Sequence, residues 1–174
     1  MHGCVIWLTG LPSSGKSTLA MHAAERLRRD GQAVAVLDGD DVRESLVPTL
    51  GYDEVYRANF YETLARLAAM LAKQGLVVLV AATAHRAQFR ARARSLAPRW
   101  IEVFVDAPEE VCRSRDPKGL WGAETSSVRL PGAGEPYEAP TDPDVHVEHL
   151  DSTEQAIAHI VEALAEDEPP VSTW

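Results

Sequence analysis

The chain has 174 residues, 45% of them hydrophobic, and a formal net charge of -9 at pH 7, which suits one well-buried domain and argues against a protein that binds duplex nucleic acid. No apolar stretch reaches the length of a membrane span, and the first residues resemble a strand rather than a signal peptide. We therefore expect a cytoplasmic protein with one domain over residues 1–167, a flexible tail at 168–174, and neither nucleic acid nor a membrane as partner.

Apolar runs of strand length alternate with helical periodicity along the chain. The strands are expected at 4–9, 33–38, 76–81, 100–107 and 145–149, and the helices at about 17–30, 57–74, 86–96, 108–115 and 152–165. Buried runs that are separated by helices are typical of a parallel sheet covered on both faces. We predict an α/β fold, in which a five-stranded parallel sheet lies between two layers of helices.

A loop rich in small residues joins the first strand to the first helix. Its spacing matches the phosphate-binding P-loop pattern G-x-x-x-x-G-K-[ST]. The candidate phosphate-binding residues are Gly10, Leu11, Pro12, Ser13, Ser14, Gly15, Lys16, Ser17 and Thr18. In such a loop the backbone N–H groups face the phosphates, Lys16 neutralises their charge, and the Ser17 hydroxyl ligates magnesium. A serine-rich helix cap would explain Ser13 or Ser14, but not Gly15 followed by Lys16 and Ser17.

The second informative stretch, LDGDDVR, begins at the carboxyl end of the second strand. Ligands of open parallel sheets bind beyond that edge, so Asp38, Asp40 and Arg43 become site candidates beside the phosphate loop. The third strand ends without an aspartate, which leaves Asp38 or Asp40 to reach magnesium through water. In the competing interpretation Asp38 and Asp41 only cap the next helix.

Residues 118–143 lack periodicity and are rich in Gly, Pro and Ser, so we predict a lid or binding loop there. Tyr137 and Glu138 would anchor its return to the last strand, although a simple turn explains them equally well. The two cysteines, Cys4 and Cys112, form no metal or redox motif and are expected to be buried.

Five stretches carry a resemblance to a known family. They are GLPSSGKSTLA, LDGDDVR, GLVVLVA, IEVFVDAPEEVCRSRDPKGLW and EPYEAPTDPDVHVE. Over nearly the whole chain the sequence resembles adenylylsulfate (APS) kinases. The resemblance implies a three-layer P-loop kinase fold, ATP and Mg²⁺ as cofactors, a homodimer as a common state, and phosphorylation of the 3′-hydroxyl of adenosine 5′-phosphosulfate.

The resemblance also implies roles for individual residues. Asp40 would be the general base or would position the hydroxyl, and it would act with Lys16 and Asp38 in direct phosphoryl transfer. Arg43 and Arg57 would contact the phosphosulfate of an anionic small-molecule acceptor. Arg115 would belong to the pocket of the ATP base.

The acceptor side departs from the family pattern D-R-x-x-N-x-x-R. Arg57 matches, while Phe60 and Thr63 occupy the positions of the asparagine and the second arginine. Phe60 could pack against a base, but its helical spacing with Leu64, Leu67 and Leu71 favours the core.

Two further family motifs are altered. The family's FISPYR becomes ATAHR, with Arg86 at the arginine and His85 near the Ser-Pro segment, and KNFTGID becomes VRLPGAG, which contains Arg129. We expect His85 and Arg86 in the acceptor site, and the other arginines of HRAQFRARARS on a solvated helix face. Either Arg86 and Arg129 restore the lost contacts, or the acceptor differs from APS.

Three functions remain open from the sequence. The first is an APS kinase, the second is a kinase for the hydroxyl of another nucleotide or metabolite, and the third is a non-catalytic nucleotide-binding regulatory protein. The intact Lys16, Ser17, Asp38 and Asp40 count against the third.

Overall fold

The structure, a computed structural model, describes residues 3–48, 53–116, 119, 121, 130–132 and 134–166. The strands are β1 (Cys4–Thr9), β2 (Val34–Asp38), β3 (Val77–Ala81), β4 (Trp100–Asp106), β5 (Leu130–Pro131), β6 (Gly134–Glu135) and β7 (Val145–Glu148). The helices are α1 (Lys16–Arg29), α2 (Gly39–Ser45), α3 (Glu54–Ala72), α4 (Ala87–Leu96), α5 (Glu109–Arg115) and α6 (Thr153–Glu166). All five predicted strands and all five predicted helices are present, with ends that differ by a few residues.

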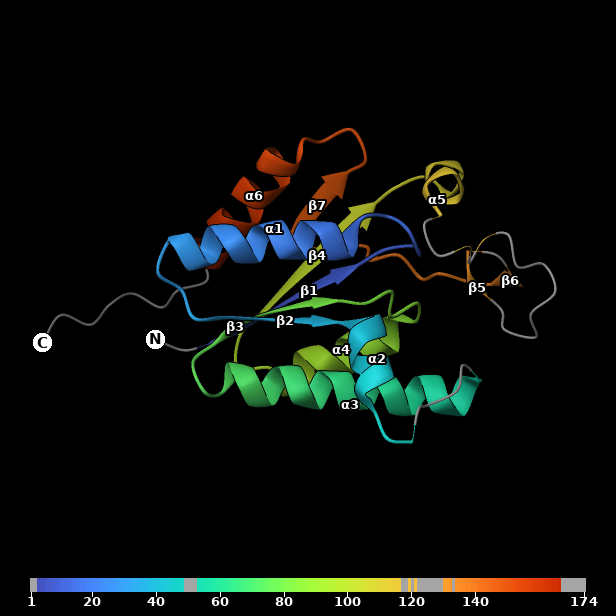
Figure 1. Cartoon of the computed structure of the whole chain (residues 1–174), viewed down its shortest axis with the longest axis horizontal. Helices are drawn as coiled ribbons and strands as arrows, with labels where there is room; N and C mark the ends of the chain where they lie inside the picture. The colour runs from blue at the N-terminus through green and yellow to red at the C-terminus, as the bar shows by residue number, and fades with distance from the viewer. Residues whose placement is uncertain are drawn as a thin grey trace, which may run out of the picture.

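The five long strands form one parallel sheet in the order β2-β3-β1-β4-β7. Figure 1 shows α1 and α6 on one face of the sheet and α3 and α4 on the other. The predicted three-layer α/β fold with a covered parallel sheet is therefore confirmed. The α5 helix and the β5–β6 ladder lie beyond the carboxyl ends of the strands, on the side where the loop after β1 turns into α1 (Figure 1).

Each face of the sheet has its own apolar core. The face under α1 and α6 is built on alternate residues of β1 and β3, such as Ile6 and Leu79, together with Leu27 and Ile160. The opposite face, under α3 and α4, includes Trp7, which stacks on Trp100 with ring centres 5.7 Å apart. Because both faces of the central strands are buried, β1 and β3 read as continuous apolar runs in the sequence.

Local caps explain where three helices begin. The α3 helix begins at Glu54, before the predicted residue 57, because the Asp53 carboxylate accepts a hydrogen bond from the Tyr56 N–H at 3.0 Å. The α2 helix, which was not among the predicted helices, begins after Asp38 in the same way. The α6 helix has the capping box of Ser152 and Gln155.

The expected lid, residues 118–143, is described only in part. Its described residues include the β5–β6 ladder and Trp121, which packs with Cys112, Leu11 and Leu130. Both cysteines are buried, as predicted, and neither forms a disulfide with a described residue. The tail at 168–174 lies outside the described residues. No helix in the described part of the chain is long and apolar enough to cross a membrane.

Candidate active site

The loop between β1 and α1 has the backbone geometry that phosphate binding requires. Gly10 has φ +154°, and a Cβ atom there would stand 2.4 Å from the Val105 carbonyl oxygen, so a larger residue does not fit. Gly15 has φ +103° and is the N-cap of α1, which begins at Lys16. Since glycine has no side chain, no side-chain hydrogen bond caps the first N–H groups of this helix. The positive end of the helix dipole therefore points into the loop, where an anion is stabilised.

The Lys16 ammonium lies over this loop. Nζ donates to the carbonyl oxygens of Gly10 at 3.0 Å and Leu11 at 2.7 Å, and it is 3.4 Å from the Ser14 hydroxyl. The residue is 8% exposed, so its charge is held close to the loop rather than in solvent. The structure places the amine against the carbonyl oxygens of the loop, and its contact with phosphates stays a prediction.

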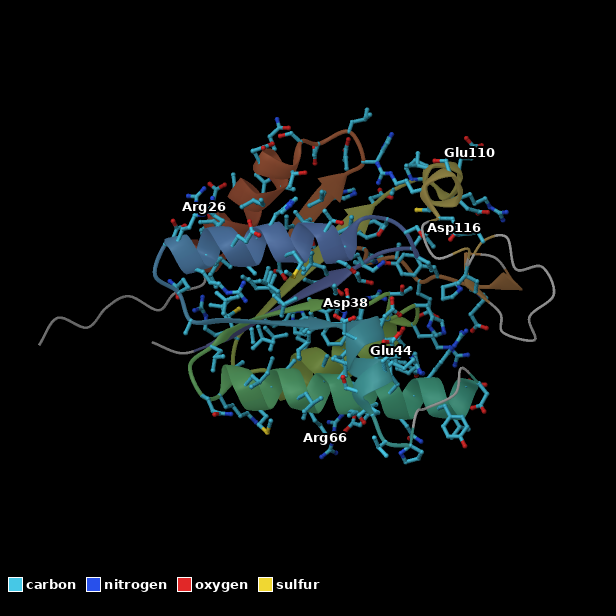
Figure 2. The ribbon with its side chains drawn as sticks, in the orientation of Figure 1. Arg26, Asp38, Glu44, Arg66, Glu110 and Asp116 are labelled. Carbon is cyan, nitrogen blue, oxygen red and sulfur yellow. The ribbon has the colours of Figure 1, made fainter. Side chains whose placement is uncertain are left out.

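Ser17 and Asp38 bring two oxygen donors together at the mouth of the loop. The Ser17 hydroxyl donates to Asp38 Oδ2, and Asp38 Oδ1 accepts from the Asp40 N–H at 2.9 Å. Figure 2 shows Asp38 where β2 meets α2, near the start of α1. Asp38 therefore both caps α2 and faces the loop, so the two interpretations of this residue are compatible. A hydroxyl and a carboxylate suit Mg²⁺, which prefers oxygen ligands and retains water.

The described residues include no group of three or more His, Cys, Asp or Glu side chains that could hold a metal ion by themselves. A bound Mg²⁺ would therefore use Ser17 directly and Asp38 or Asp40 through water, together with the phosphates of the nucleotide.

Two of the residues predicted to bind the acceptor are buried arginines. Arg43 of α2 is 7% exposed and Arg57 of α3 is 9% exposed. The Arg43 guanidinium lies 3.9 Å from the centre of the Phe60 ring, a cation–π contact. Phe60 itself is 3% exposed and belongs to the α3 core, as its helical spacing predicts.

Tyr61 joins the acceptor arginines to the loop after β3, and sequence reasoning missed it. Burial raises the pKa of its phenol, while the Ala84 N–H and the Arg43 and Arg57 cations lower it and the Asp40 carboxylate raises it. The charges of three predicted residues, Asp40, Arg43 and Arg57, therefore all influence the pKa of one phenol. They form one electrostatic cluster, although they come from two helices.

The loop after β3 places His85 beside this cluster. Ala84 has φ +41°, and its N–H donates to the Tyr61 hydroxyl at 3.1 Å. His85 is 2% exposed, and its Nε2 lies 3.4 Å from a Glu135 carboxylate oxygen. Burial and the Arg57 cation lower the pKa of His85, so the ring is neutral at pH 7. Its Nδ1 atom has no hydrogen-bond partner among the described residues.

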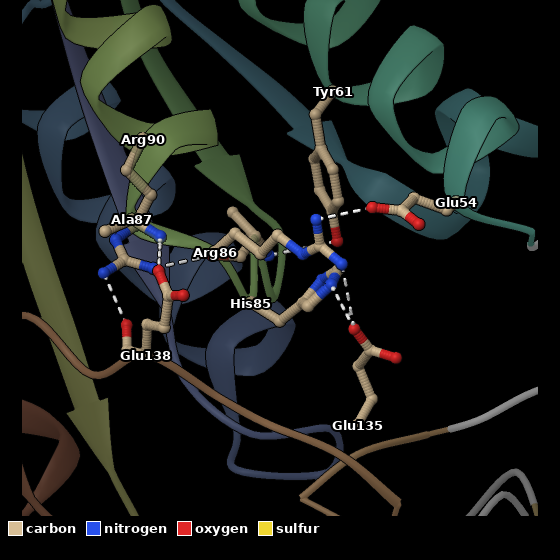
Figure 3. Close-up of polar contacts among 9 residues, drawn as sticks. Glu54, Tyr61, His85, Arg86, Ala87, Arg90, Glu135 and Glu138 are labelled. Atoms are coloured by element: carbon tan, nitrogen blue, oxygen red, sulfur yellow. Dashed lines mark hydrogen bonds and ion pairs between the residues drawn. The ribbon is translucent and has the colours of Figure 1, made fainter.

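Arg86 lies at the rim of the site. Its guanidinium contacts Glu54 at 2.7 Å and Glu135 at 3.4 Å, and the side chain is 32% exposed (Figure 3). These two carboxylates raise the pKa of Arg86, so the group stays charged. Its contact with the acceptor stays a prediction.

The expectation that the remaining arginines of α4 form a solvated face is wrong for Arg90. This residue is 4% exposed and donates to the carbonyl oxygens of Ala84 and Glu138 at 2.6 Å each, and to the Glu102 carboxylate at 2.9 Å. Arg90 lies one turn after Arg86, and in the predicted helix 86–96 this i, i+4 spacing places both residues on the same face. The spacing was the signal in the sequence that could have identified Arg90. Arg90 ties the His85 loop to the segment after β6.

Tyr137 and Glu138 anchor that segment, as one of the two interpretations predicts. The Tyr137 hydroxyl lies 3.0 Å from the Thr9 hydroxyl at the end of β1. Glu138 accepts from the Ala87 N–H at 2.6 Å, and its own N–H donates to the His85 carbonyl at 2.7 Å (Figure 3). The segment is thus joined to both sides of the site.

The buried Tyr137 hydroxyl gives an expected pH dependence of stability. Burial raises its pKa to about 12 from 10.0, so the folded chain keeps this proton where the unfolded chain loses it. The contribution of Tyr137 to the free energy of unfolding is therefore complete below pH 10 and is lost between about pH 10 and pH 12. Tyr137→Phe should show a shallower alkaline loss in urea unfolding across this interval. Parallel curves for the two proteins would contradict the assignment.

The ATP-base side is less defined. The nearest contact to a Cβ built on Gly15 is Arg115 Nη1 at 3.9 Å, so this guanidinium lies against the phosphate loop. Its role toward the base stays a prediction. Arg129, predicted to contact the acceptor, lies outside the described residues.

Known proteins resemble this chain over most of its length. The family model described as adenylylsulphate kinase matches residues 2–148. The adenylyl-sulfate kinase of Chloroflexus aurantiacus is 40% identical over 165 residues, which cover 93% of this chain and 89% of the relative. That of Deinococcus deserti is 43% identical over 148 residues, or 83% and 81% of the two chains.

Among solved structures, this chain is similar to the Mycobacterium tuberculosis APS kinase CysC, solved in complex with AMPPNP and APS. The TM-score is 0.87 and the sequences are 34% identical, over 94% of this chain and 98% of the other. The likeness therefore extends over nearly the whole fold.

Proposed function

The chain belongs to the adenylylsulphate kinase family, and on that premise we propose that it transfers the γ-phosphoryl group of ATP to the 3′-hydroxyl of adenosine 5′-phosphosulfate (APS). It is an ATP-dependent kinase with a hydroxyl acceptor. The observation that supports the acceptor most directly is the pair of buried arginines, Arg43 and Arg57, whose charges act together with that of Asp40 on the pKa of the buried Tyr61.

In this proposal the phosphate loop and Lys16 hold the phosphates of ATP, and their charges stabilise the negative charge that spreads over the transferring group. Asp40 orients the acceptor hydroxyl or accepts its proton. Bound Mg²⁺ would be held by Ser17 and the aspartates and would neutralise phosphate charge. No covalent intermediate with the enzyme is required.

The buried arginines select an anionic acceptor. Arg43 and Arg57 are both less than one tenth exposed, and a guanidinium in a desolvated site favours a phosphate or sulfate partner. A homodimer and a cytoplasmic location remain predictions that follow from the sequence and its resemblance.

Replacement of Arg57 by Ala tests the acceptor assignment. Removing a cation that contacts the phosphosulfate should raise the KM for APS by about 10-fold or more, the scale of one charge-assisted hydrogen bond, with a much smaller effect on the KM for ATP. The measurement is steady-state release of ADP with each substrate varied in turn. A KM for ATP close to that of the unaltered enzyme also shows that the variant is folded.

Arg66→Ala is the matched control, because Arg66 lies on the same helix and its side chain is 66% exposed. It should leave both KM values unchanged. Efficient phosphorylation of an uncharged alcohol that is insensitive to Arg57→Ala would contradict the anionic acceptor, while an absence of any turnover with APS would contradict the proposed reaction.

A further inference from the structure

The acceptor side of the site contains an internal anion. The Glu135 carboxylate, on β6, lies 3.4 Å from both the Arg86 guanidinium and the His85 ring. Figure 3 shows one carboxylate oxygen directed at both groups. A contact that joins residues so far apart in the sequence results from the tertiary fold, not from a local turn.

This carboxylate is held in a partly desolvated place. The Glu135 side chain is 18% exposed and His85 is 2% exposed. The other carboxylate on Arg86, that of Glu54, is 72% exposed and is therefore strongly screened by water. Of the two acidic partners, Glu135 is the one whose charge reaches the interior of the site.

Glu135 is also within electrostatic reach of the buried acceptor arginine. The charges of Arg57 and Glu135 act on the same His85 ring and in opposite directions. Because that ring is neutral, it adds no positive charge to the site. Glu135 therefore cancels part of the positive charge that Arg57 and Arg86 present to an anionic ligand.

A ligand can approach this contact from solvent. A groove of ≈ 310 Å³ is lined by Arg86, Gln88, Glu135, Pro136 and Glu138. The Arg86 guanidinium and the Glu135 carboxylate both line this groove, so an anion that enters it meets a negative charge beside the positive one. Like charges at short range oppose binding, and the effect is largest where water is excluded.

We propose that Glu135 is a specificity-determining residue of the acceptor site, whose carboxylate occupies the anion position between Arg86 and His85 and lowers the affinity of the site for negatively charged acceptors. The inference rests on the proposed function for its choice of acceptor. It goes beyond that function because it assigns a residue that opposes anion binding. Glu135 would thereby determine how much negative charge an acceptor can carry and still bind well.

Glu135→Gln tests this role. The amide keeps the size of the side chain and can still accept hydrogen bonds from Arg86 and His85, but it removes the charge. The KM for APS should fall by about 2- to 10-fold, the range for one partly screened charge contact, while kcat and the KM for ATP stay unchanged. A purely structural role for Glu135 would instead lower kcat and alter both KM values.

Glu62→Gln is the matched control, because it makes the same change in net charge on the outer surface of α3, where Glu62 pairs with Arg66 and Arg92. It should leave the KM for APS unchanged. If the KM for APS is unaltered or rises in Glu135→Gln, the inference is overturned, and a rise would mean that the carboxylate binds the acceptor directly.

A second measurement separates this inference from the proposed reaction. Binding of inorganic sulfate is measured by calorimetry, with the phosphate loop filled by a non-hydrolysable ATP analogue. Sulfate should bind more tightly to Glu135→Gln than to the unaltered enzyme. Tighter sulfate binding without any turnover of APS would overturn the proposed function and support the role of Glu135, whereas turnover of APS with unchanged sulfate binding would overturn the role of Glu135.

Discussion

Lys16→Ala should abolish phosphoryl transfer while the chain remains folded. The Lys16 ammonium is held against the phosphate loop by the Gly10 and Leu11 carbonyl oxygens, and we propose that it neutralises the transferring phosphate there. Loss of one preorganised hydrogen-bond donor costs about 10²- to 10³-fold in kcat. Lys16 also carries a full positive charge, so we expect the loss in kcat on its removal to lie at or above the upper end of that range. Release of ADP with APS as acceptor is the measurement.

Lys73→Ala is the matched control, because Lys73 is an exposed residue at the end of α3. This substitution removes the same charge at a place far from the loop. It should turn over at the unaltered rate. The thermal unfolding midpoint of Lys16→Ala should stay within a few degrees, because the helix it begins is packed on the sheet by Leu19, Ala20, Ala23 and Leu27. Unchanged turnover in Lys16→Ala would refute the role of the loop in binding the phosphoryl donor.

The donor half of the site could be predicted from the sequence because its geometry is local. Gly10 and Gly15 lie in one loop, and Lys16 and Ser17 are the first two residues of the helix that follows it, so the whole motif is contained in a short stretch of sequence. The sheet was equally predictable, since strands buried on both faces leave a strong apolar signal. The loop and each single strand therefore depend on a short run of consecutive residues.

The acceptor half could be predicted only in part, because its contacts are long-range. Arg90 reads in the sequence as one of several arginines on α4, and only the fold shows that it binds the Ala84 and Glu138 carbonyls. Glu135 likewise gives no local signal, since it meets His85 through the tertiary fold. The α2 helix was missed because a helix of 7 residues carries little periodicity.

Asp40→Asn should lower kcat by roughly 10²-fold or more, with little effect on the KM for ATP. The charge of this carboxylate influences the pKa of Tyr61 together with those of Arg43 and Arg57, and we propose that it faces the acceptor hydroxyl. The Asn amide has the size of the Asp40 carboxylate but does not accept a proton. The decrease in kcat therefore measures the role of the Asp40 charge in orienting or deprotonating the acceptor hydroxyl.

The structure removes the competing explanation that Asp40 is needed as a helix cap. The cap of α2 is Asp38, whose carboxylate accepts from the Asp40 backbone N–H, and Asp40→Asn leaves that N–H in place. Asp41→Asn is the matched control, because Asp41 is an exposed neighbour in the same first turn and makes the same change in charge. Asp41→Asn should retain full activity. A kcat in Asp40→Asn close to that of Asp41→Asn would show that phosphoryl transfer proceeds without a carboxylate at residue 40, and that the acceptor hydroxyl is positioned by the arginines alone.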